Sequence, residues 1–114
     1  MSDYTDYQEQ IFFGEVAEAR LELSELSRWK ADYESKRDKY PSWITSSGQH
    51  IKVRNITNSH LENLLKFVKK RDPNNETKWY DIFKAEKFYR GINTRIAKAQ
   101  LLCDKYSHII DTVF

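Results

Sequence analysis

The three histidines and a group of glutamates are the side chains that metal chemistry would use. His50, His60 and His108 are scattered, and none has the His-x-x-x-His or His-Glu-x-x-His spacing that puts two ligands on one helix face. Four glutamates recur every three or four residues, as in di-iron helical bundles: Glu15, Glu18, Glu22 and Glu25. Those bundles also need Glu-x-x-His motifs, which the sequence lacks. We therefore expect no metal site, and interpret the acidic stretch as a solvated helix face or a docking face for a basic protein.

The residue spacing gives no support to nucleophilic or phosphate chemistry. Gly14, Gly48 and Gly91 are isolated, so the sequence contains no glycine-rich loop that would cradle a phosphate. The single cysteine, Cys103, lies in a helical apolar pattern, which is typical of a small buried hydrophobic residue rather than a reactive thiol. No nucleophile is paired with a base. The sequence predicts a protein that is not an enzyme and needs no cofactor.

Basic residues lie close to aromatic residues in the middle of the chain. The six cations of this patch are Lys52, Arg54, Lys66, Lys69, Lys70 and Arg71, and the aromatic residues that follow are Trp79, Tyr80 and Phe83. Such a combination can hold phosphates and stack bases, so it is a candidate site for a nucleic acid or nucleotide. Two structural interpretations stay open, because cations in a last helical turn complement the helix dipole and aromatic residues at a helix start commonly belong to a core.

Length and composition indicate one soluble domain over residues 1–114. The chain has 39% hydrophobic and 32% charged residues, which suits helices with narrow apolar stripes. No apolar run is long enough to cross a membrane, and the first residues are acidic where a signal peptide would be basic. We expect a cytoplasmic protein. Its charge is uneven: residues 1–42 carry ten acids and six bases, whereas residues 43–79 carry three acids and seven bases.

Two long helices are predicted over residues 5–39 and 77–112. The second contains an unbroken heptad pattern: Ile82, Ala85, Tyr89, Ile92, Ile96, Ala99, Cys103, Tyr106, Ile110 and Val113. The first has a shorter stripe of Phe12, Val16, Ala19, Leu23 and Leu26, which becomes polar at Lys30, Tyr33 and Arg37. Pro41 ends this helix, since proline disfavours helical dihedral angles in the preceding residue. Asn75 or Thr77 is the expected cap of the second helix.

A small module separates the long helices. Alternating residues around Gly48 predict a β-hairpin over residues 43–56, with Trp43, Ile51 and Val53 on its contact face. A short helix is predicted over residues 59–71, with either a Ser59 capping box or Asn58 as its cap. The result is a mainly α fold in which the long helices form an antiparallel, coiled-coil-like hairpin. Pairing of the last helix with a second copy stays open, and a homodimer is the favoured oligomer.

Residues 43–65 carry a recognisable pattern. A tryptophan is followed by a polar turn with glycine, alternating apolar residues, and His-Leu-x-Asn at a helix start. The matching positions are Trp43, Gly48, Ile51, Val53, His60, Leu61 and Asn63. This segment resembles a group of small uncharacterised tailed-bacteriophage accessory proteins, although Asn55 and Ile56 depart from its usual acid and methionine. The resemblance implies a phage-encoded hairpin and helix module, and it implies no activity.

The functional hypothesis is a phage accessory protein that binds and inhibits a host macromolecule of a defence or transcription system. The polar end of the first helix should lie opposite the aromatic start of the last one, where apolar surface would stay uncovered. The partner-binding residues expected there are Lys30, Arg37, Trp79, Tyr80 and Phe83. Alternatives are a nucleic-acid-binding protein that uses the basic 66–71 patch, an oligomeric sponge for a nucleotide signal, and a virion or assembly component.

Overall fold

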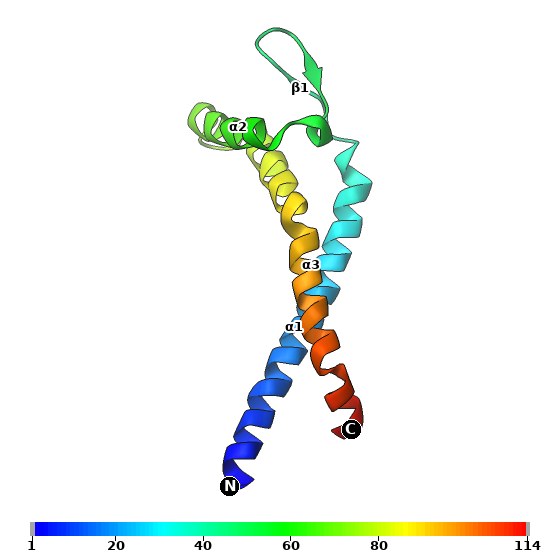
Figure 1. Ribbon diagram of the computed structural model, residues 1–114. Helices are drawn as coiled ribbons and strands as arrows, with labels where there is room; N and C mark the ends of the chain where they lie inside the picture. Colours follow the sequence, from blue (N-terminus) through cyan, green and yellow to red (C-terminus); the bar gives the residue numbers. More distant parts are fainter. Residues whose placement is uncertain (1, 114) are drawn as a thin grey trace. The chain divides into compact units, whose positions relative to one another are not determined.

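The chain forms three helices and a two-stranded antiparallel sheet (Figure 1). In this computed structural model the backbone is described for residues 2–113 and the side chains for residues 14–106. The elements are α1 (Ser2–Arg37), β1 (Trp43–Ile44), β2 (His50–Ile51), the 3-10 turn η1 (Val53–Asn55), α2 (Asn58–Arg71) and α3 (Trp79–Val113). The predicted mainly α fold is therefore confirmed. The seam positions Phe12, Ile110 and Val113 and the side chain of His108 fall outside the described side chains.

Two compact units are present. Unit 1 contains residues 1–29 and 92–114, and unit 2 contains residues 30–91, so α1 and α3 contribute to both. Unit 2 carries fourteen Lys and Arg against eight Asp and Glu, a net charge of +6, whereas unit 1 carries five against nine, a net charge of −4. That the two units form one domain stays a prediction.

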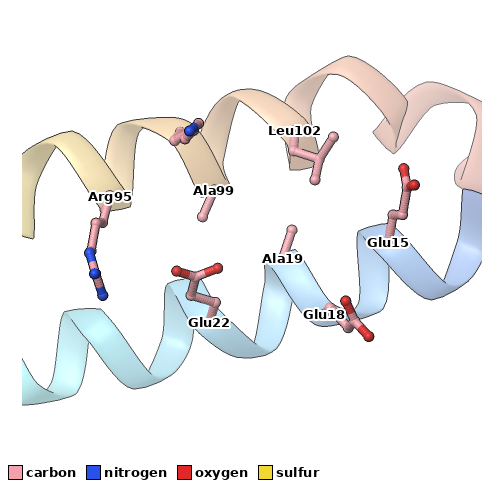
Figure 2. Close-up of a pocket in the computed structure, with 8 residues that line it drawn as sticks. Glu15, Glu18, Ala19, Glu22, Arg95, Ala99 and Leu102 are labelled. Carbon is pink, nitrogen blue, oxygen red and sulfur yellow. The ribbon is translucent and has the colours of Figure 1, made fainter.

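Unit 1 is a pair of antiparallel helix segments held by a narrow stripe of buried residues. The stripe consists of Val16, Ala19 and Leu26 from α1 and Ile92, Ala99 and Cys103 from α3. Figure 2 shows Ala19 and Ala99 both pointing into the space between the two helices. These buried positions follow the predicted seams, so the expectation that the two long helices pack against each other within one chain is confirmed.

Unit 2 contains an apolar cluster built around α2. Leu61, Leu64 and Val68 from α2 pack with Ile56 and Phe83. A second layer is less deeply buried and covers this cluster: Trp43, Ile51, Leu65, Trp79 and Tyr80. Because a two-stranded hairpin is marginal by itself, these contacts of Trp43 and Ile51 are what hold β1 and β2 in place.

The hairpin is shorter than its sequence pattern predicts. Pairing joins Trp43 to Ile51 and Ile44 to His50, and the turn uses Gly48 at a φ of 83°, as expected. The strand prediction over residues 52–56 is wrong, because the chain turns into η1 after Ile51. Val53 is buried there, and its carbonyl accepts a hydrogen bond of 3.2 Å from Arg90 Nη2 of α3. A contact with a residue 37 positions away cannot be inferred from local alternation.

The start of α2 differs from the predicted caps, whereas at the start of α3 the hydroxyl of the predicted Thr77 accepts from the Trp79 amide at 3.5 Å. Thr57 caps α2, and its hydroxyl accepts from the amide of His60 at 3.3 Å, so Ser59 and Asn58 are the first residues inside the helix rather than caps. The helix α3 begins at Trp79, two residues later than expected. Asp72 orders the preceding loop, because its carboxylate accepts from the amides of Glu76 and Thr77, each at 2.9 Å.

Candidate functional site

The most deeply buried polar group of unit 2 is the carboxylate of Glu86, whose side chain is fully buried. Its Oε1 accepts from the Tyr33 hydroxyl and from Arg37 Nε, both at 2.8 Å. Its Oε2 accepts from Arg37 Nη2 and Arg90 Nε, both at 2.7 Å. Each oxygen therefore has two donors. A buried carboxylate with this many partners is a structural group and leaves no lone pair for a substrate or metal.

The electrostatics of this network keep Glu86 ionised. Burial raises the pKa of the Glu86 carboxyl, but the hydrogen bonds from Arg37, Arg90 and Tyr33 outweigh it and hold the pKa below its ordinary value. Burial and the hydrogen bond to Glu86 raise the pKa of the Tyr33 hydroxyl, so Tyr33 stays a donor. The Glu86 carboxylate is thus held ionised between two guanidinium groups that share its negative charge.

Arg90 joins this network to the hairpin and α2. Besides Glu86, its guanidinium donates to Asn58 Oδ1 at 2.8 Å and to the Val53 carbonyl. It therefore fixes the start of α2 against α3. Sequence reasoning missed both Glu86 and Arg90, although their spacing of four residues on one helix face is a readable signal of an ion pair.

The predicted partner-binding residues occupy different environments. Phe83 is 0% exposed at the centre of the cluster, so its assignment to a binding surface is corrected: it is a core residue. Arg37 is committed to Glu86 and its guanidinium carbon lies 4.7 Å from the ring centre of Tyr89. Trp79 and Tyr80 are half-buried against the cluster, and Lys30 lies 3.9 Å from Glu34. The polar end of the α1 seam is thus matched by Glu86 rather than left uncovered.

An apolar groove lies instead between the hairpin and α2. It has a volume of about 480 Å³ and is lined by Trp43, Ile44, Thr45, Ser46, His60, Leu64 and Phe67. Leu64 belongs to the buried cluster, whereas Ile44 is 56% and Phe67 48% exposed. Sequence reasoning missed this groove. Ile44 lies on the strand face opposite Trp43, and Phe67 follows His60 and Leu64 at helical spacing. The sequence therefore indicates which face of its element each residue occupies, but not that these two faces meet in the fold.

The six cations of the predicted nucleic-acid patch do not form one set. Arg54 is taken by Asp38, with Nε–Oδ1 and Nη2–Oδ2 distances of 2.7 Å. Lys52 and the four α2 cations form no ion pair with any described residue, and all five are exposed. These α2 cations are Lys66, Lys69, Lys70 and Arg71, the last with its guanidinium carbon 5.5 Å from the ring centre of Phe67. Unneutralised charge therefore gathers on α2, beside the groove.

Unit 1 contains a second, more polar groove of about 450 Å³ between α1 and α3. Its lining comprises Glu15, Glu18 and Glu22 from α1, Arg95 and Lys98 from α3, and the apolar residues Ala19, Ala99 and Leu102. In Figure 2, Arg95 points towards α1 and Glu22 towards α3. The acidic face predicted for α1 is thus bordered by cations of its own chain, and its use for docking stays a prediction.

Among the residues with described positions, no group of three or more His, Cys, Asp or Glu side chains could hold a metal ion. Within the same part of the chain, none of the helices has the length and apolar character needed to cross a membrane. Comparison of the chain with protein-family models, curated proteins and solved structures finds no match in any of the three.

Proposed function

We propose that the protein is a non-enzymatic phage accessory protein that binds and inhibits a host macromolecule of a defence or transcription system in the host cytoplasm. The phage origin rests on the resemblance of residues 43–65 to tailed-phage accessory proteins. The binding role rests on the groove between β1 and α2, where Ile44 and Phe67 are exposed beside uncompensated positive charge. We call this surface, together with the four α2 cations, the α2 surface.

The groove supports a binding role because its walls are both exposed and anchored. Trp43 precedes Ile44 on β1 and makes edge-on contacts with Trp79 and Phe83, with ring centres 5.2 and 5.4 Å apart. Phe67 lies on α2 one turn after Leu64, which lines the same groove and belongs to the buried apolar cluster. Exposed apolar side chains on a fixed backbone lose little conformational entropy on binding. Binding hot spots commonly consist of such preorganised side chains.

Nucleic acid is the second candidate ligand, since five exposed cations without ion partners could contact phosphates. Two observations count against it. Arg54 already pairs with Asp38, and the Phe67 ring carries the Arg71 guanidinium over it, where a base would stack. A salt titration of binding to single-stranded and duplex DNA tests this candidate, because an affinity that rests on phosphate contacts falls steeply as the salt concentration rises.

The heptad seam of unit 1 supports a further proposal, that α1 and α3 pack as an antiparallel coiled coil that can also form a homodimer. Leu21 and Leu101 support self-association, because both are apolar and more than 60% exposed outside the buried stripe. Light scattering tests the dimer. A nucleotide sponge requires such an oligomer, so a strict monomer would eliminate both the homodimer and the sponge. A thermal shift with cyclic nucleotides would favour the sponge.

The central experiment is a quantitative pull-down from host lysate, followed by an activity assay of the captured target. The double variant Ile44→Ser/Phe67→Ser should lose the target, because it removes the two exposed walls of the groove. The control is Leu21→Ser/Leu101→Ser, which removes two apolar side chains of unit 1 that are more exposed than Ile44 and Phe67 and should still capture the target. Equal capture by both variants would contradict the proposal, as would a captured target whose activity is unchanged.

A further inference from the structure

The α2 cations are not neutralised by the acids that stand nearest to them in the sequence. Glu62 lies four residues before Lys66, a spacing that permits an ion pair, yet its carboxylate bonds Lys87 of α3 at 2.8 Å. Asp72 follows Arg71 directly, but its two oxygens accept from the loop amides and from the Thr77 hydroxyl at 2.5 Å. Both local counter-charges are therefore used for folding.

The positions of the four α2 cations are only partly explained by the stability of the helix. Cations in the last turn of α2 complement the helix dipole, which accounts for Lys69, Lys70 and Arg71. Lys66 stands one turn earlier, four residues before Lys70, a spacing at which two like charges repel each other. A negatively charged partner would remove this repulsion and use all four cations.

The charges and the groove belong to one helix surface. His60, Leu64 and Phe67 line the groove at spacings of four and three residues, and Arg71 continues that stripe over the Phe67 ring. Lys70, three residues after Phe67, lies beside the stripe, and Lys66 lies one turn before Lys70. A ligand that places an apolar group between Ile44 and Phe67 would thus meet positive charge along the neighbouring turns of α2.

Resting on the proposed function, we infer that the α2 surface recognises an acidic protein segment: a large aliphatic or aromatic side chain enters the groove, and flanking Asp or Glu carboxylates pair with Lys66, Lys70 and Arg71. The apolar walls and the uncompensated cations are both needed, which favours an acidic amphipathic segment over a purely polar one. Nucleic acid supplies the charge but not the aliphatic anchor.

Selection of displayed random peptides on the full-length chain tests this inference. Enriched peptides should contain an apolar anchor with an excess of Asp and Glu around it. Ile44→Ser/Phe67→Ser should lower their affinity about 30-fold, the loss of a typical hot spot. Enrichment of neutral or basic peptides, or no enrichment, would overturn the inference.

A charge reversal sharpens the test. Lys66→Glu/Lys70→Glu/Arg71→Glu should lose the acidic peptides and, in a fresh selection, enrich basic ones. The control Arg20→Glu/Arg28→Glu/Lys105→Glu makes the same change of net charge at exposed positions of unit 1 and should keep the original preference. Circular dichroism of both triple variants checks the fold. If both lose the peptides equally, net charge and not the α2 surface determines binding.

The outcomes separate this inference from the proposed function. A host target that is lost on changing Ile44 and Phe67 but kept on charge reversal leaves the function standing and overturns the acidic partner. Acidic peptides that bind the α2 surface while no inhibited host target exists support the acidic ligand and overturn the function. Binding of DNA that the charge reversal abolishes, without peptide enrichment, identifies nucleic acid as the ligand instead.

Discussion

The helices α1 and α3 pack against each other through different kinds of residues in unit 1 and in unit 2. In unit 1 the buried stripe is narrow and contains small residues such as Ala19, Ala99 and Cys103. In unit 2 the same two helices enclose Tyr33 and Glu86, and aromatic rings add to the core. A two-helix stripe buries little area, so the groove of unit 1 has only two helix faces as walls, whereas the groove of unit 2 is backed by a core of several elements.

The placement of charge follows the same division. The acids and bases of unit 1 line the rim of a groove between exposed helix faces, where water screens them. In unit 2 the buried Glu86 carboxylate is paired with Arg37 and Arg90, whereas the α2 cations are exposed and form no ion pair with a described residue. Unit 2 is therefore the region where a change of one residue should have the largest effect on stability, and where a partner finds uncompensated charge.

The largest difference should come from the two cores. Phe83→Ala removes a fully buried ring stacked 5.2 Å from Trp79 and should lower the free energy of unfolding by about 4 kcal/mol. Cys103→Ala in unit 1 removes one buried sulfur and should cost about 1 kcal/mol. Urea denaturation followed by circular dichroism measures both. Similar costs would show that the units depend on their cores equally.

The buried carboxylate should rank second. Glu86→Ala leaves the guanidinium groups of Arg37 and Arg90 without their partner in a largely buried space, and should cost about 3 kcal/mol. The matched control is Glu62→Ala, which breaks an ion pair between half-exposed side chains and should cost less than about 1 kcal/mol. Amide hydrogen exchange should show the loss of protection at the start of α2, which Arg90 holds. Unchanged protection there would disprove the role of Arg90.

Close helix contact in unit 1 gives the third prediction. Ala99→Leu adds three carbons to a buried side chain that points into the space between α1 and α3, and overpacking should cost about 2 kcal/mol. Leu101→Ala, on the exposed side of α3, should change stability by less than about 0.5 kcal/mol. A stabilised Ala99→Leu variant would mean that the two helices are not in close contact at this point.

The pH dependence of stability should be the smallest effect. The pKa of Glu86 is lower in the folded chain than in the unfolded chain. Its contribution to the free energy of unfolding is therefore complete at neutral pH and is lost as the pH falls below about 4. The pKa of Tyr33 is raised by burial, so its contribution is lost as the pH rises above about 10. Denaturation of the wild type and Glu86→Gln across pH 3–7 measures the acid limb. Parallel curves would contradict the assignment to Glu86.

Local patterns in the sequence accounted for the elements with repeating signals. Six of the heptad positions between Val16 and Leu26 and between Ile92 and Cys103 are buried, Leu23 and Ile96 are partly buried, and Gly48 takes the positive φ of a turn. The expected end of the first helix before Pro41 agrees with the observed end at Arg37. These features depend on neighbours within a few residues or on a periodic face, which a sequence displays directly.

The features that the sequence did not predict depend on contacts between residues far apart in the chain. Tyr33 and Glu86 are 53 positions apart, and Arg90 meets Asn58 over 32 positions, so no local pattern indicates that the polar end of the α1 seam would close over a carboxylate. The bond from Arg90 to the Val53 carbonyl is likewise a distant contact, and so is the packing that buries Phe83 while Ile44 and Phe67 stay exposed.

The sequence by itself determined that two long helices pair and that a small module with a basic helix separates them, because periodicity and charge order are properties of the chain. Only the tertiary structure decided which charges are satisfied. An ion pair between distant residues forms or fails according to where the folded backbone brings them, and that geometry left Lys66, Lys70 and Arg71 unmatched beside an open apolar groove.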